Sequence, residues 1–168
     1  LKLADAALLE GVSFVGMKAR DGDDASCLNL NQSLAPPLLG VDPASLKGRF
    51  GADWSLLEAE GDVVPALVGD AATPVWKLKK PLGSILEYAD ERGRPFKVRL
   101  AGALPMRLSI FQGRLLISQA RFTRLFPSEA GRRLFAADVP PGREAAVAAY
   151  LAKRLETAGF DAVPAGKR

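Results

Sequence analysis

Apolar and basic residues alternate most regularly between positions 95 and 101. This segment, PFKVRLA, has apolar residues at 96, 98 and 100 and basic residues at 97 and 99. Alternate residues of a strand point to opposite faces of a sheet, so the pattern predicts a strand with one apolar and one basic face. The preceding Asp90-Glu-Arg-Gly93 is typical of a hairpin turn, and it predicts pairing with a strand over residues 82–88.

Five further apolar segments also predict strands. They cover residues 12–20, 63–68, 113–117, 134–139 and 160–163. The first of them alternates imperfectly, which is typical of a strand that is buried on most of both faces.

Capping residues predict where helices begin and end. Asp42 followed by Pro43 predicts a helix start, because aspartate caps helix N-termini and proline fits the first helical position. Ser118 caps a predicted helix over 119–126. A longer helix over 143–158, ended by Gly159, would form a strand–helix–strand unit with its flanking strands. Short helices or turns are expected over residues 1–10, 54–60 and 70–78.

The alternation of these elements predicts an α+β fold. A chain of 168 residues, 48% of them hydrophobic and 25% charged, is long enough to bury a core as one domain or two small subdomains. No apolar run approaches the ~18 residues that span a bilayer. The chain begins Leu-Lys-Leu without an initiator methionine, so we expect it to be part of a longer protein.

Charge is divided unevenly along the chain. Residues 1–90 hold 8 Lys/Arg against 13 Asp/Glu, and residues 91–168 hold 15 against 6. A coherent basic stripe would indicate nucleic-acid binding. The arginines of the second half are instead scattered among apolar residues, as on solvated strand and helix faces, so no nucleic-acid partner is expected.

The side chains that most often carry catalysis are missing. The chain has no histidine and one cysteine, Cys27. This excludes Ser–His and Cys–His nucleophiles, zinc sites built on histidine, and an internal disulfide. No Walker A, Rossmann or nucleophile-elbow pattern occurs. We therefore expect no enzyme activity, and we assign no catalytic residue, no metal ligand and no cofactor.

A few residues still have an alternative, functional interpretation. Asp21-Gly-Asp-Asp-Ala-Ser26 begins like a calcium loop, but it lacks the ligands that complete one. Asp23 and Asp24 fit acid–base chemistry, although such pairs more often bond local backbone N–H groups in a turn. Asn31-Gln-Ser33 fits a glycosylation sequon. Cys27 is better explained as a packed small hydrophobe.

The aromatic residues allow a similar choice between core and site. Trp54 and Trp76 have rings that stack on ligands, but two tryptophans in a chain of this length usually close cores. Phe122, Leu125 and Phe126 would suit a partner helix, or an internal core stripe, which we favour.

Several blocks, read in order, resemble the periplasmic core domain of MacB-like and FtsX-like ABC permeases. The most specific is GDDASCLNL at 22–30, followed by LLGV at 38–41. Further blocks are similar to an inserted β-rich subdomain of that family; they are residues 63–70, 76–78, 82–86 and 96–104. Residues 115–118, with the helix that ends at 125–126, resemble the strand and short helix that follow there. The resemblance covers most of the chain. The chain departs from the family at Ser84, where aspartate is common.

The resemblance implies a specific architecture. Residues 1–60 and 133–168 would form a porter-like α+β subdomain, with a β-rich subdomain of residues 61–132 inserted in it. One transmembrane helix would enter the domain and a second would leave it, so that its two ends lie close together. The domain would stand on the periplasmic face of the inner membrane.

The resemblance also implies the partners and the role. A cytoplasmic ABC ATPase would hydrolyse ATP, and this domain would transmit the resulting movement in concert with a permease dimer mate. A periplasmic protein or lipoprotein would be the substrate or signalling partner. The alternative is a free-standing soluble periplasmic protein that binds a ligand between its two subdomains. An enzyme that uses Asp23 or Asp24 is a third hypothesis.

Overall fold

The structure is a computed structural model, which describes residues 7–22, 35–73, 78–105 and 110–162. The chain divides into two compact units. The larger unit comprises residues 16–134, and the smaller unit comprises residues 1–15 together with 135–168. The fold is α+β, as the sequence predicts, with a mixed sheet of seven strands in the described part of the chain.

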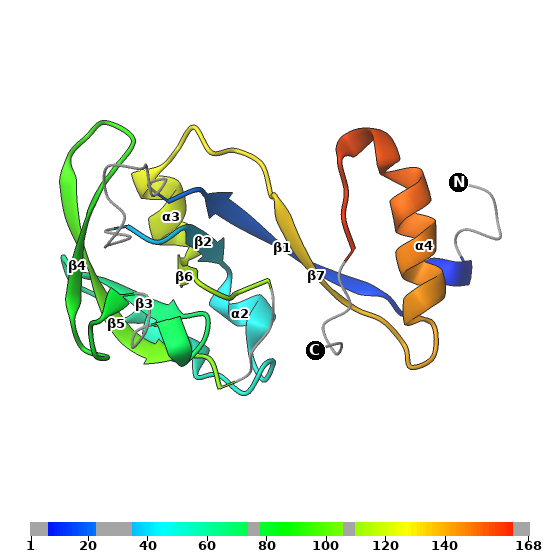
Figure 1. Cartoon of the computed structure of the whole chain (residues 1–168), viewed down its shortest axis with the longest axis horizontal. Helices are drawn as coiled ribbons and strands as arrows, with labels where there is room; N and C mark the ends of the chain where they lie inside the picture. The colour runs from blue at the N-terminus through cyan, green and yellow to red at the C-terminus, as the bar shows by residue number, and fades with distance from the viewer. Residues whose placement is uncertain (1–6, 23–34, 74–77, 106–109, 163–168) are drawn as a thin grey trace. The chain divides into compact units, whose positions relative to one another are not determined.

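The strands follow one another in the sheet in the order β4-β5-β3-β6-β2-β1-β7 (Figure 1). Their bounds are β1 Ser13–Arg20, β2 Leu38–Val41, β3 Val64–Val68, β4 Ile85–Ala89, β5 Pro95–Ala103, β6 Leu115–Ser118 and β7 Leu134–Asp138. β4 and β5 form the predicted antiparallel hairpin. β5 pairs in parallel with β3, and β6 pairs in parallel with β2. β3 pairs with β6, and β1 with β2, in antiparallel orientation.

The helices are short. They are α2 Pro43–Leu46, α3 Gln119–Leu125 and α4 Glu144–Arg154, with 3₁₀ turns η1 Trp54–Glu58 and η3 Glu156–Ala158. The predicted caps are present: the Asp42 carboxylate accepts a hydrogen bond from the Ala44 N–H at 3.2 Å, and the Ser118 hydroxyl accepts one from the Arg121 N–H at 3.4 Å.

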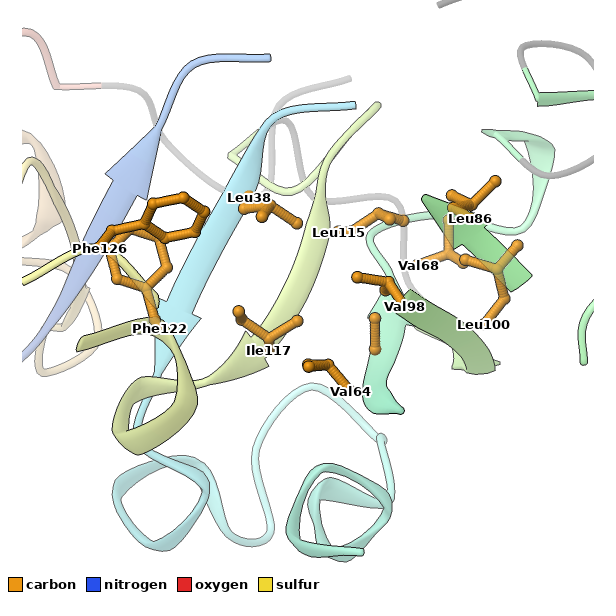
Figure 2. Close-up of a cluster of buried hydrophobic side chains, with 11 residues drawn as sticks. Leu38, Val64, Val68, Leu86, Val98, Leu100, Leu115, Ile117, Phe122 and Phe126 are labelled. Atoms are coloured by element: carbon orange, nitrogen blue, oxygen red, sulfur yellow. The ribbon is translucent and has the colours of Figure 1, made fainter. Parts of the chain in front are cut away.

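Both faces of the central strands are covered, because β2, β3 and β6 are buried at every residue. One face carries the core cluster in Figure 2, in which Phe122 and Phe126 pack with aliphatic side chains of the strands. On the opposite face, Leu39, Leu116 and Leu67 lie in register across three strands, and η1 packs against β3.

Gly40 sets how closely α3 approaches this sheet. A Cβ atom at position 40 would lie 2.6 Å from Cγ of Phe122, closer than real Cβ contacts. The Phe122 ring therefore occupies the space that a side chain at position 40 of β2 would fill. Only glycine fits at this position without a shift of α3.

The smaller unit contains α4 and both described ends of the chain. Val147 of α4 is buried, and the Arg143 guanidinium donates hydrogen bonds to the carbonyl oxygens of Ala7, at 3.1 Å, and Leu8. Gly159 adopts a left-handed conformation (φ 66°) at the end of η3, in agreement with its predicted role as a helix terminator.

The predicted strand over residues 160–163 is wrong where the structure describes it. Residues 160–162 form no strand, and position 163 lies outside the described residues. The Phe160 N–H donates to the Leu155 carbonyl oxygen at 3.4 Å, so this backbone group completes the helix end instead of joining a sheet. The predicted strand–helix–strand unit therefore lacks its second strand among residues 160–162.

The two compact units are not the subdomains that the resemblance implies, which would meet at residues 60/61 and 132/133. The boundaries of the units fall after Val15 and after Leu134. The physical reason is the parallel pairing of β2 with β6, together with the packing of η1 on β3. These contacts join residues 38–58 to the rest of the sheet.

Candidate functional site: the junction at the end of α3

The sequence candidates that the structure describes belong to the core. The Trp54 side chain is 3% exposed, and its indole N–H donates to the Arg49 carbonyl oxygen at 3.0 Å. Phe122 and Phe126 are fully buried, so the interpretation of this stripe as internal core is confirmed. The calcium-like loop beyond Gly22, the sequon and Trp76 lie outside the described residues, as do the other candidates, Asp23, Asp24 and Cys27.

Asp70, the most buried carboxylate that the structure describes in the larger unit, caps a turn. Burial raises the pKa of Asp70, but hydrogen bonds from the Thr73 hydroxyl (2.6 Å) and from the N–H groups of Gly113 (3.1 Å), Thr73 (2.8 Å) and Ala72 (2.9 Å) outweigh it. The pKa is therefore held below its ordinary value of 3.8. An ionised carboxylate with all its partners in the protein is a structural cap. Over the described residues, no group of three or more Asp, Glu or Cys side chains is placed to hold a metal.

Several long-range polar contacts of the described part of the larger unit meet at one place. We call residues 125–129, where α3 ends and the chain turns, the α3 junction. The helix stops because residue 127 is a proline. The Phe126 N–H donates to the Phe122 carbonyl oxygen at 2.9 Å, and the Glu129 N–H donates to Phe126 at 3.1 Å. The remaining polar groups of this turn point to two other elements.

The β4–β5 hairpin is bound to one side of the α3 junction. The Glu91 N–H donates to the Leu125 carbonyl oxygen at 3.2 Å. The Glu91 carboxylate accepts hydrogen bonds from the N–H and the hydroxyl of Ser128, at 2.9 and 2.7 Å. These two bonds from Ser128 lower the pKa of Glu91 below its usual value, so the carboxylate stays charged at neutral pH.

The hairpin turn that presents Glu91 is itself tightly bonded. The Asp90 carboxylate accepts hydrogen bonds from the N–H groups of Arg92 and Arg94, both at 2.9 Å, and from the Arg94 guanidinium at 2.8 Å. Burial raises the pKa of Asp90, but the hydrogen bonds from Arg94 and Arg92 and the charge of Arg94 lower it by more. The pKa of Asp90 therefore lies below its ordinary value. The turn therefore holds Glu91 in a fixed position.

β1 is bound to the other side of the α3 junction. The Lys18 ammonium donates to the Glu129 carbonyl oxygen at 2.8 Å. The Arg20 guanidinium lies 3.5 Å from the Glu129 carboxylate and 4.5 Å from the centre of the Phe126 ring. The ion pair is partly exposed and contributes little alone. Together with the cation–π contact, it fixes the end of β1 against the turn.

A row of aromatic rings continues from the α3 junction to the far edge of the sheet. The ring centres of Phe126 and Phe96 are 6.1 Å apart, and Phe96 stacks on Tyr88 of β4 at 5.7 Å. The Tyr88 hydroxyl donates to the Pro36 carbonyl oxygen at 2.9 Å, just before β2. Packed rings resist compression. The junction therefore joins β1, α3 and the β4–β5 hairpin into one mechanical unit.

A hollow lies beside α3 in the described part of this unit. Its volume is ≈ 230 Å³, and its lining includes Asp62, Phe96, Arg121 and Arg124. It is smaller than the ligand pockets of about 300–1,000 Å³ that bury small molecules. Arg121 also donates to the carbonyl oxygens of Gly61 and Ala59, at 2.9 and 3.0 Å. The hollow therefore offers little basis for a small-molecule site.

Comparison with known proteins gives no assignment: no family model and no curated protein matches the chain. Within the described residues, every helix is too short or too polar to cross a membrane.

Proposed function

We propose that this chain is an extracytoplasmic domain of a MacB-like or FtsX-like ABC permease that transmits movement and carries out no chemistry itself. In this proposal a cytoplasmic ATPase hydrolyses ATP, membrane helices move, and the domain passes that movement to a substrate or partner protein outside the cytoplasm. The resemblance of the sequence blocks motivates the family. The path of the chain supports it.

That path is the observation on which the proposal depends most. The chain leaves the smaller unit through β1, between Val15 and Gly16, and returns to it through β7, between Leu134 and Phe135. β1 and β7 are neighbours in the sheet, and the described residues nearest both ends share the smaller unit. A domain set between two consecutive membrane helices requires this arrangement.

The α3 junction supports the transmitting role. β1 carries the chain out of the smaller unit, and its Lys18 and Arg20 contact the junction directly. On the other side of the junction, Glu91 connects to the β4–β5 hairpin. A displacement of β1 would therefore move the far edge of the sheet as well, because packed and hydrogen-bonded elements shift together and do not deform continuously.

A dimer mate and a periplasmic protein or lipoprotein are the partners that fit this role. The alternative, a free-standing periplasmic ligand-binding protein, requires an enclosed ligand site. The hollow beside α3, open and ≈ 230 Å³ in volume, gives that alternative little support.

Membrane extraction of the parent protein tests the proposal. We expect the parent to stay in the membrane pellet after an alkaline carbonate wash, and to co-purify with an ABC ATPase subunit in mild detergent. Release of the parent into the carbonate supernatant would contradict the proposal. A parent retained in the membrane without any ATPase would contradict the permease assignment.

A further inference from the structure

β4 is an edge of the sheet among the described strands, because it pairs with β5 on one side and stands first in the sheet order. In an antiparallel pair, the backbone groups of alternate residues point toward the partner strand and away from it. The Asp90 N–H donates to the Arg94 carbonyl oxygen, and the Leu100 N–H donates to that of Ser84. Both bonds involve even-numbered residues on the β4 side. Because the direction of the backbone groups alternates along a strand, the even-numbered residues of β4 bond to β5.

The odd-numbered residues therefore present a free edge. Ile85, Glu87 and Ala89 direct their N–H and C=O groups away from β5. Their side chains are also the exposed ones of the strand, whereas Leu86 and Tyr88 face the core. A row of outward backbone groups is a template for one more strand, and native sheets usually cover or interrupt such an edge.

Two large apolar side chains lie exposed along this edge. Leu82 is 50% exposed, and Ile85 is 45% exposed. The edge strand contains no proline and no lysine, the residues that commonly prevent pairing. The combination of free backbone groups and exposed apolar side chains suits an extended chain, which satisfies both at once, better than a helix or a lipid surface.

The charge around the edge is positive. On β5, Lys97 is paired with Glu87 and Arg99 with Ile85, and both basic residues are exposed. Lys79 and Lys80 precede the strand and are also exposed. These four basic residues outnumber Glu87, the one acidic residue of β4, while Asp90 and Glu91 beyond the strand are bonded to Arg94 and Ser128. An incoming acidic strand would be attracted, and a basic strand or a second copy of the same positive surface would be repelled.

We propose that the β4 edge binds an extended acidic peptide segment of a partner protein as an additional strand. Backbone hydrogen bonds to Ile85, Glu87 and Ala89 supply the binding, apolar partner side chains cover Ile85 and Leu82, and the basic residues select for acidic ones. The proposal depends on the sheet edge alone, so it stands or fails independently of the permease assignment.

Fluorescence anisotropy with two synthetic peptides tests the charge preference. The probes are fluorescein-labelled (Asp-Val)₄ and (Lys-Val)₄, titrated with the full 168-residue chain at low ionic strength. We expect the acidic peptide to bind at least tenfold more tightly than the basic one. Equal affinities, or no binding of the acidic peptide, would overturn the proposal.

Two variants localise the binding to the edge. Glu87→Pro removes an outward N–H that β5 does not use, so the edge strand tolerates it while strand addition is blocked. It should weaken binding of the acidic peptide at least tenfold, whereas Glu87→Ala, its matched control, should retain or strengthen it. The double variant Lys97→Glu/Arg99→Glu leaves the backbone unchanged and should reverse the preference, even if Glu87→Pro fails to fold.

Other occupants give different results. If sedimentation shows a dimer that Glu87→Pro converts to a monomer, the edge serves self-association and the proposal is wrong. If the acidic peptide binds Glu87→Pro and the double charge variant as tightly as the unaltered chain, the peptide binds elsewhere and the proposal is equally wrong.

Discussion

The Glu91 carboxylate accepts both the N–H and the hydroxyl of Ser128, at 2.9 and 2.7 Å, and these two residues are 37 positions apart in the chain. The contact fastens the tip of the β4–β5 hairpin to the turn that ends α3. β1 reaches the same turn from its other side through Lys18 and Arg20. The turn that ends α3 is therefore bound on one side by the hairpin and on the other by β1.

Glu91→Ala should loosen the hairpin without unfolding the sheet. It removes the two hydrogen bonds that the Glu91 carboxylate accepts from Ser128. It leaves the hydrogen bonds of the Asp90 turn and the buried residues of β5 in place. We expect faster hydrogen exchange at the backbone N–H groups of residues 90–94, and unchanged exchange in β6, measured by NMR. The control Glu58→Ala alters an exposed glutamate of η1 and should change neither. Equal exchange rates at residues 90–94 in the two variants would show that the contact is not a structural tie.

Gly40→Ala should destabilise the larger unit. The added Cβ would lie 2.6 Å from Cγ of Phe122, so α3 must move away from β2. Overpacking of this kind costs about 1–3 kcal/mol. The matched control is Gly131→Ala, where a Cβ meets nothing within 4 Å. Urea unfolding measures both, and a Gly40→Ala variant as stable as the control would contradict the packing described for α3.

Asp70→Asn should also destabilise the larger unit, because an amide replaces an acceptor-only carboxylate that receives four hydrogen bonds. Leaving buried partners unsatisfied costs about 1–3 kcal/mol. Exposed Asp161→Asn is the control, and surface changes of this kind stay within about 0.5 kcal/mol. Chemical unfolding at neutral pH measures the free energy of unfolding of both variants. Equal stability of the two would contradict the structural role of Asp70.

The pH dependence follows from the same carboxylate. The folded-state pKa of Asp70 lies below the unfolded value of 3.8, so between the two values the unfolded chain binds more protons and stability rises with pH. This contribution is fully present above the unfolded pKa and is lost as the pH falls through the folded pKa. In Asp70→Asn, the loss of stability on acidification should be shallower. An acid unfolding profile parallel to that of the unaltered chain would contradict the assignment.

Local patterns in the sequence were enough to predict most of the elements. Alternation at 95–101 identified β5, the Asp90–Gly93 turn identified its hairpin, and Asp42 and Ser118 identified helix starts. Each of these signals depends on residues that are neighbours in the chain, where strand period and capping chemistry act directly.

The α3 junction could not be predicted in this way. Arg20 and Glu129 are 109 residues apart, and they meet only because the strand order places β1 beside β2 and α3 against β2. The division after Val15 depends on contacts of the same kind, since the parallel pairing of β2 with β6 is non-local. The strand expected at 160–163 was predicted from a segment of only four residues, FDAV. Over residues 160–162 no strand forms, and the Phe160 N–H donates to the Leu155 carbonyl oxygen at the helix end.

Cysteine labelling tests whether this domain lies outside the cytoplasm in a membrane-embedded parent. The parent would carry Lys97→Cys at an exposed position of β5, with Cys27→Ser and with any cysteines elsewhere in the parent replaced. A membrane-impermeant maleimide would then be added to intact spheroplasts. We expect Lys97→Cys to be labelled before the inner membrane is broken. Labelling that occurs only after lysis would place the domain in the cytoplasm and contradict the account.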